Sequence, residues 1–179
     1  DPRLSQFPSL AVDPSGNVHV VWMDDRHGAF PGGDWAVHYT KLNNNGNIVI
    51  GDKPLTNWTD NVYEEYPSIA VDSNGFLHLA YADSRDDAAM YTDEIYYVKF
   101  TNNALPITNK IRVSFNNTSN SLIPAITVDS NNNVHIVWED DLFGSPYVNP
   151  EIFYRKLSTN GEYLTPEIRL TTATGLSVE

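Results

Sequence analysis

Aspartate residues end a strongly apolar segment at three places in the chain, as Asp24, Asp83 and Asp140. Further carboxylates surround each of them, and Ca²⁺ binds six to eight oxygen atoms from carboxylates and carbonyls. The pattern raises a calcium site as one hypothesis, and no other cofactor is required. A structural interpretation competes with it, because an aspartate after a strand can accept backbone N–H groups of its own loop. Recurrence in every unit favours the structural role, since ligand sites seldom repeat from unit to unit.

Histidine residues recur in the same segments, as His19, His78 and His135. Side chains alternate between the two faces of a strand, so each histidine points away from the apolar residues on either side of it. Three histidines bind one metal only if their nitrogen atoms converge to about 2.1 Å from it. Histidines in separate units meet that condition only at a common axis. We expect instead that each histidine bonds a buried partner between neighbouring units.

Two tryptophans and two arginines in loops are candidate ligand contacts. Trp35 and Trp58 do not recur, and an indole ring can stack on a sugar or side chain, or pack over its own loop. Arg26 and Arg85 occupy matching positions, and a guanidinium group can hold a carboxylate through two parallel hydrogen bonds. The predicted binding face consists of the loops in which the units differ most: 26–34, 85–93 and 142–150.

Sequences of the Asn-x-Ser/Thr type occur at Asn57, Asn116 and Asn117. Such sequences are acceptors of N-linked glycans in secreted proteins, and these fall in equivalent connections between units. The sequence thus predicts glycosylated loops on an extracellular or cell-surface protein. The absence of cysteine does not bear on this prediction, because disulfides mark oxidising compartments but their absence marks none.

Motifs for covalent catalysis are absent from the sequence, which has neither a Ser-His-Asp pattern nor a glycine-rich phosphate loop. Hydrolysis of a glycosidic bond needs only two carboxylates about 5–9 Å apart. The acidic loops supply many carboxylates, so the residue types leave glycosidase chemistry open.

Three copies of one pattern must position these residues. They read FPSLAVDPSGNVHVVWMDDR, YPSIAVDSNGFLHLAYADSR and IPAITVDSNNNVHIVWEDDL, with their prolines 59 and 57 residues apart. A unit of that size, filled with short strands, cannot bury its faces alone. The repeat therefore predicts similar units that stack on one another.

Each copy contains four short segments with the character of strands. A turn that begins at Asp13, Asp72 or Asp129 separates the first two, and the following Gly or Asn suits a tight hairpin. β-Branched and aromatic residues fill the second segment, as in a buried strand. Four antiparallel strands per unit are typical of a β-propeller blade, whereas a β-sandwich does not normally repeat the same residues in register.

We therefore predict an all-β fold, a propeller segment of three four-stranded antiparallel blades at about residues 1–58, 59–116 and 117–179. Three blades are too few to close a ring, because propellers have about four to eight. The segment is then half of a six-bladed ring made by two chains, or part of a larger propeller. Either arrangement requires self-association or further blades.

The net charge of -12 bears on the partners of the chain. Nucleic acids and anionic membranes attract basic surfaces, so neither is an expected partner. No apolar run approaches the roughly 20 residues of a membrane-spanning helix, and no membrane insertion is expected. Protein and glycan remain as partners.

The repeats resemble those of sialidase-like and BNR-repeat (Asp-box) propellers, and of repeat arrays in secreted microbial surface proteins. The resemblance rests on the proline-containing strand, turn and acidic-ended strand from Ser121 to Asp140, and extends weakly over all three units. It implies a propeller fold and, for a sialidase, hydrolysis of a glycosidic bond. The chain lacks the arginine that a sialidase carries two positions before the proline, having Gln6, Glu65 and Leu122 there. The Ser-x-Asp-x-Gly-x-Thr-Trp order of an Asp-box is not reproduced either.

The first functional hypothesis is a non-catalytic module of a secreted or cell-surface protein, which assembles or binds protein or glycan through its loop face. One alternative is a fragment of a sialidase-like glycoside hydrolase with its catalytic residues in other blades. The other alternative is a self-assembling extracellular filament or surface-layer subunit.

Overall fold

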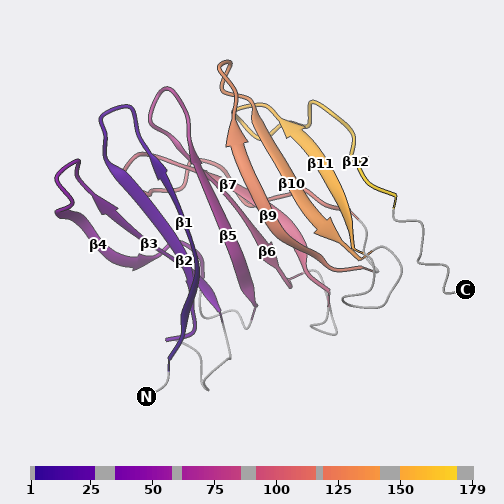
Figure 1. Ribbon diagram of the computed structural model, residues 1–179, viewed down its shortest axis with the longest axis horizontal. Helices are drawn as coiled ribbons and strands as arrows, with labels where there is room; N and C mark the ends of the chain where they lie inside the picture. Colours follow the sequence, from indigo (N-terminus) through magenta and orange to yellow (C-terminus); the bar gives the residue numbers. More distant parts are fainter. Residues whose placement is uncertain are drawn as a thin grey trace, which may run out of the picture.

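Three antiparallel sheets stand side by side in the computed structural model (Figure 1). It describes residues 3–26, 35–57, 62–85, 92–115, 119–141 and 150–172. Within these residues all regular secondary structure is β-strand, which confirms the predicted all-β fold. No helix in this described part is long and apolar enough to cross a membrane.

Each sheet has four strands, and we name the sheets blades 1, 2 and 3. Blade 1 consists of β1 (Ser5–Val12), β2 (Val18–Asp24), β3 (Ala36–Leu42) and β4 (Ile48–Pro54). Blade 2 consists of β5 (Glu64–Val71), β6 (Leu77–Asp83), β7 (Glu94–Phe100) and β8 (Ile111–Arg112). Blade 3 consists of β9 (Ser121–Val128), β10 (Val134–Asp140), β11 (Glu151–Leu157) and β12 (Ile168–Arg169). Neighbours along the chain pair with each other, so each blade is a simple meander.

The first hairpin of each blade turns as the Asp-turn pattern predicts. In blade 1 the carboxylate of Asp13 accepts the backbone N–H groups of Ser15 and Asn17, both at 2.9 Å. Gly16 closes the turn with φ of +81°, a conformation that glycine adopts without steric cost. The same bonds recur at Asp72 and Asp129.

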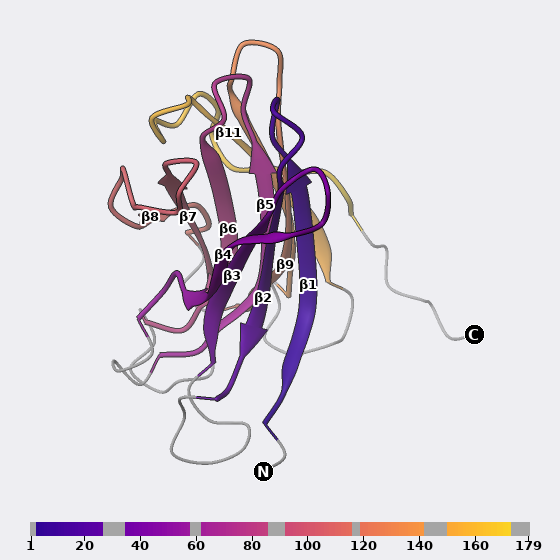
Figure 2. The same ribbon diagram turned by 90° about the vertical axis from the view of Figure 1, so that its left-hand side faces the viewer.

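The blades pack face to face through two apolar cores. Val21, Val37 and Tyr39 of blade 1 meet Leu79 and Tyr81 of blade 2 in the first core. Ala80, Ile95 and Tyr97 of blade 2 meet residues such as Ile136 and Trp138 of blade 3 in the second. Among the first strands, β5 contacts both β1 and β9 across the stack. Figure 2 looks along the stack and shows β1 at one edge, with β7 and β8 toward the opposite edge.

Side chains of the second strand alternate between two blade interfaces. In β2, His19, Val21 and Met23 are buried against blade 2, whereas Val18 and Val20 on the other face are half-buried. In β6, which has a blade on each side, all seven residues are buried. Burial thus follows the number of neighbouring blades, as stacking units require.

Candidate functional site

The recurring aspartates at the ends of β2, β6 and β10 tie together segments of their own blade. Asp24 is 1% exposed and accepts hydrogen bonds from Ser5, Trp22 and Arg26, the last through both the backbone and the guanidinium group. Burial alone would raise the pKa of Asp24, but hydrogen bonds from Arg26, Ser5 and Trp22 outweigh burial and lower the pKa. The carboxylate therefore ties the end of β2 to the start of β1.

Equivalent aspartates in the other blades make the same kind of tie. Asp83 is buried and accepts the backbone N–H of Arg85 at 2.9 Å and its guanidinium at 2.8 and 2.5 Å. In blade 3, where the arginine position holds Leu142, the hydroxyl groups of Ser119 and Ser121 donate to Asp140 at 2.8 and 2.9 Å. No group of three or more potential metal ligands comes together among the residues that the structure describes.

The candidate ligand contacts occupy different environments. Arg26 and Arg85 bind the neighbouring aspartates, and Arg26 also pairs with Asp52. Trp35 is only 7% exposed, so its ring packs inside the protein and offers no open platform. Asn57 lies exposed just beyond β4. Trp58, Asn116 and Asn117 lie outside the described residues.

The recurring histidines bond within their own blade, so the prediction of partners between blades is wrong. His19 places Nδ1 2.8 Å from the Tyr39 hydroxyl and Nε2 3.3 Å from the Asp13 carboxylate. His78 lies at the same distances from Tyr97 and Asp72, and His135 at 2.9 and 3.2 Å from Tyr154 and Asp129. A histidine on β2 meets a tyrosine on β3 because the two residues share one face of adjacent antiparallel strands. We call each set an Asp-His-Tyr triad.

Two buried glutamates share the end of blade 2 that carries Asp83. Glu64 accepts Lys110 Nζ at 2.5 Å, and Glu94 accepts the Ser114 hydroxyl and the Arg112 guanidinium. Burial raises the pKa of both carboxyl groups to about 7, against the opposing effect of the neighbouring cations. These residues also lock strands together rather than facing solvent, since both are at most 2% exposed.

A bulge interrupts the first strand of every blade at the repeated proline. In blade 1 the pairing with β2 shifts between Gln6 and Ser9, so that two residues oppose Trp22 alone. The same shift occurs in β5 and β9. Bulges redirect side chains and are over-represented near active sites. The conserved geometry of three bulges in adjacent strands therefore marks a candidate site.

The residue before each of these prolines has a left-handed backbone. Phe7, Tyr66 and Ile123 have φ of 51°, 51° and 52°. A residue before proline normally adopts an extended backbone, and a bulky or β-branched residue with positive φ is an outlier. Such strain costs about 1–3 kcal/mol per residue and gathers at ligand-binding sites.

The three strained residues line a shallow groove across the first strands, which we call the axial groove. It has a volume of about 190 Å³ and is lined by residues 7–9, 66–68 and 123–124. Phe7 and Ile123 are about half exposed, and the Phe7 and Tyr66 rings meet edge to face with centroids 4.7 Å apart. The groove therefore presents apolar and aromatic surface from all three blades.

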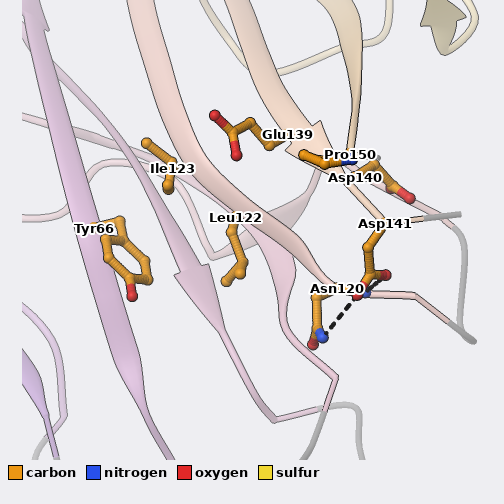
Figure 3. A pocket seen from close by; sticks show the side chains of 8 residues that line it. All are labelled: Tyr66, Asn120, Leu122, Ile123, Glu139, Asp140, Asp141 and Pro150. Atoms are coloured by element: carbon orange, nitrogen blue, oxygen red, sulfur yellow. Dashed lines mark hydrogen bonds between the residues drawn. The ribbon is translucent and has the colours of Figure 1, made fainter. Parts of the chain in front are cut away.

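A smaller pocket of about 100 Å³ continues the axial groove beside Tyr66 and Ile123. Figure 3 shows Glu139 and Leu122 on this side of blade 3, with Asn120 hydrogen-bonded to Asp141 at its rim. Carboxylates and an amide thus flank the apolar surface. No lysine or arginine lines either hollow in the described part of the chain.

Sequence reasoning missed this groove, although it had one available signal. The prolines define the repeat, whereas the residue in front of each proline varies. Repetition of the proline with Phe, Tyr and Ile before it marks a fixed backbone that carries different side chains. The departure from a sialidase at Gln6, Glu65 and Leu122 falls directly beside the same bulges.

Comparison with family models and with curated proteins finds no match. Among solved structures the chain is similar to a Hadza microbial sialidase, Hz136, with 9% identity and a TM-score of 0.69 over 89% of this chain. It is also similar to an endo-arabinase from Bacteroides thetaiotaomicron, with 11% identity and a TM-score of 0.60 over 93% of this chain. The polysaccharide lyase Uly1 matches with 9% identity and a TM-score of 0.60 over 92% of this chain.

The chain has the fold of three β-propeller blades. It spans 36%, 63% and 40% of the lengths of these three proteins. The predicted resemblance to sialidase-like propellers is thus confirmed at the level of the fold, and no Asp-box repeat accompanies it.

Proposed function

We propose that this chain is a non-catalytic part of a secreted or cell-surface β-propeller that binds glycan in the axial groove. The observation that carries the proposal is the threefold bulge, which holds Phe7, Tyr66 and Ile123 at one place in strained conformations. Ring faces and aliphatic side chains suit the C–H faces of sugars, while nearby polar groups fix orientation. The structural neighbours, whose names denote a sialidase, an arabinase and a lyase, support a glycan rather than a protein ligand.

The chemistry of the groove favours neutral glycans. Capture of an acidic sugar relies on cations, above all on arginine in bidentate contact with a carboxylate. The described lining offers none, and it includes the carboxylates of Glu139, Asp140 and Asp141. The net charge of -12 further disfavours an anionic ligand.

Isothermal titration calorimetry with defined oligosaccharides tests the proposal. We expect neutral arabino- or xylo-oligosaccharides to bind and sialyllactose, the anionic comparison, not to bind. Phe7→Ala should weaken binding by a factor of about 2 to 10, because stacking on an aromatic ring contributes about 0.5–1.5 kcal/mol beyond burial. Leu105→Ala is the control, since Leu105 is 60% exposed and lies outside the groove. Binding of sialyllactose alone, or equal binding by Phe7→Ala, would contradict the proposal.

One observation favours a second candidate, cleavage of a glycosidic bond in a complete propeller. Glu65 directly precedes the groove residue Tyr66, and burial raises the pKa of its carboxyl group. A carboxyl group whose pKa is raised by burial is suited to general-acid catalysis. Hydrolysis of the bound oligosaccharide that is lost in Glu65→Gln, with binding retained, would establish this candidate in place of the non-catalytic one.

A further inference from the structure

The outermost faces of blades 1 and 3 are more exposed than the equivalent faces inside the stack, which a neighbouring blade covers. We call the side of a blade toward the preceding blade its upstream face, and the other side its downstream face. On the upstream face, Leu10 of blade 1 is 63% exposed, whereas Ile69, which pairs equivalently in blade 2, is 5% exposed. On the downstream face, Val37 of blade 1 is buried, whereas Ile152 of blade 3 is half-buried. No described residue covers the upstream face of blade 1 or the downstream face of blade 3.

A lysine on the third strand ties each blade to a turn of the next blade. Lys41 of blade 1 donates to the Asn102 side chain in the turn after β7. Lys99 of blade 2 donates to the Thr159 hydroxyl at 2.8 Å in the equivalent turn of blade 3. Blade 3 has Lys156 at this position, and here the lysine reaches Asp129 of its own blade at 3.2 Å.

The turn that Lys41 and Lys99 reach in the next blade has an equivalent in blade 1, at the other end of the same chain. The turn after β3 in blade 1 begins at Asn43 and closes with the same backbone bond as the turns after β7 and β11. Asn44 occupies in it the position of Asn102 and Thr159. An amide oxygen is thus available for a lysine that approaches the upstream face of blade 1.

An isoleucine and a glycine make a second complementary pair. The side chain of Ile111 in blade 2 packs against Gly161 in blade 3 so closely that a Cβ at Gly161 would collide with it. Ile168 pairs with Tyr154 as Ile111 pairs with Tyr97, and it is 38% exposed. Gly46 has the position and positive φ of Gly161, and nothing lies within 4 Å of a Cβ built there. The downstream end therefore carries the isoleucine, and the upstream end carries the open glycine.

We propose that the downstream face of blade 3 docks onto the upstream face of blade 1 in a second copy of this chain. Lys156 would then donate to Asn44, and Ile168 would pack over Gly46, as their equivalents do inside the chain. Because the contact joins two different faces, it is heterologous, and two copies close it twice around a two-fold axis. The product is a six-bladed ring, within the range of about four to eight blades that propellers use.

One hydrogen bond that joins blades inside the chain has no equivalent at this junction, and restoring it gives a gain-of-function test. Ser9 and Ser68 each accept a backbone N–H from the next blade, that of Ile69 at 3.2 Å and that of Ile126 at 3.3 Å. The equivalent residue of blade 3 is Ala125. Ala125→Ser should therefore supply an acceptor for the N–H of Leu10 in the second copy. It should tighten the dimer about 25-fold, the effect of one net hydrogen bond at each of the two junctions.

Size-exclusion chromatography with light scattering, on the 179-residue chain, tests the proposal. We expect a mass twice the chain mass of 20.1 kDa. Leu10→Asp and Ile168→Asp, each on an open face, should be monomeric alone. Mixed together they should form a heterodimer, because one upstream face and one downstream face remain intact. Leu105→Asp should stay dimeric, since Leu105 is exposed on blade 2, whose two faces are already covered.

Three outcomes would overturn this proposal. The first is a folded wild-type monomer at every concentration reached. The second is a dimer that Leu10→Asp dissociates but Ile168→Asp leaves intact, which would indicate pairing of two upstream faces. The third is an open-ended filament, which would exclude the closed ring. Circular dichroism of each variant must match that of the wild-type chain, so that loss of folding is not read as loss of the dimer.

Discussion

The two ends of the blades differ in what recurs from one blade to the next. At the end with the Asp-turns, the Asp-His-Tyr triads repeat both residues and geometry, with histidine-to-tyrosine distances of 2.8, 2.8 and 2.9 Å. At the bulges of the axial groove only the backbone repeats, with φ of 51°, 51° and 52°, while the side chains change from Phe to Tyr to Ile. Fixed side chains with fixed partners build the blade. A fixed backbone with variable side chains is suited to recognition.

This contrast assigns opposite mutational behaviour to the two ends. Substitution at a triad leaves buried polar groups without partners, which is expensive. Substitution at the groove removes half-exposed side chains and strain, which costs little stability. The following predictions test that difference.

The largest expected effect is that of His78→Ala. It removes the partner of Asp72 Oδ2 and of the Tyr97 hydroxyl in the interior and opens a cavity, so the free energy of unfolding should fall by about 4 kcal/mol. His135→Ala removes the same residue from blade 3, where the histidine side chain is 28% exposed and water can replace it, and should cost about 1 kcal/mol. Urea unfolding at neutral pH measures both values. Equal losses would show that burial does not set the cost of the triad.

The second effect concerns pH. The pKa of Glu94 is raised to about 7 from its usual 4.5, so the folded state binds a proton that the unfolded state has released between these values. The contribution of Glu94 to stability is thus fully present below about pH 4.5 and is lost as pH rises through 7. The difference amounts to about 3 kcal/mol, and Glu64 acts in the same direction.

Urea unfolding between pH 8 and pH 4.5 checks this expectation. The part of the stability that comes from Glu64 and Glu94 should rise as the pH falls over that range, and Glu94→Gln should remove its share of that rise. Below about pH 6.5 His19 and His78 act in the opposite direction, because burial lowers their pKa values. Below about pH 4 the trend reverses, because the pKa values of Asp13 and Asp24 are lowered and protonation of these carboxylates removes their stabilising bonds. An unchanged slope in Glu94→Gln would assign the titration to other groups.

The third effect is a gain in stability at the groove. Asparagine tolerates the left-handed backbone better than isoleucine, and Ile123 is 51% exposed, so Ile123→Asn should raise the free energy of unfolding by about 1 kcal/mol. Thr127→Asn, at an exposed position of the same strand with ordinary backbone, is the control and should lower it. A loss in both variants would mean that the bulge is not strained.

The smallest effect is that of a chelator. The carboxylates of Asp24, Asp83 and Asp140 already accept hydrogen bonds from arginine or serine, so EDTA should leave the melting temperature unchanged in calcium-free buffer and in buffer with added calcium. A drop in melting temperature on chelation would revive the calcium hypothesis, because a metal bound to the folded state must stabilise it.

The fold could be predicted because two of its features are visible in the sequence itself. These are the alternation of side chains with a period of two residues along each strand, and the three copies of one pattern. The turns at Asp13, Asp72 and Asp129 also followed, since the side chain makes its bonds within four residues. The triads did not, because their tyrosine lies on the neighbouring strand. Its recurrence as Tyr39, Tyr97 and Tyr154 was nevertheless a usable signal.

The left-handed backbone of the axial groove did not follow from the sequence, because a residue before proline is normally extended. Only the packing of three adjacent first strands fixes the left-handed alternative at Phe7, Tyr66 and Ile123. Likewise, the sequence left open whether Trp35 stacks on a ligand or packs over its own loop, and tertiary packing buries it.

The Asp-His-Tyr triads have a consequence for the order of folding. Their partners are 6 and 19 or 20 residues apart, whereas the serine ties between blades join residues 58 and 60 apart. Short loops close at a lower entropic cost and faster than long ones, so each blade should form on its own before the blades stack. Stacking then brings together units that share one interface design. During refolding at high concentration, a blade from another molecule can take the place of the next blade along the chain, so domain-swapped species are the expected by-product.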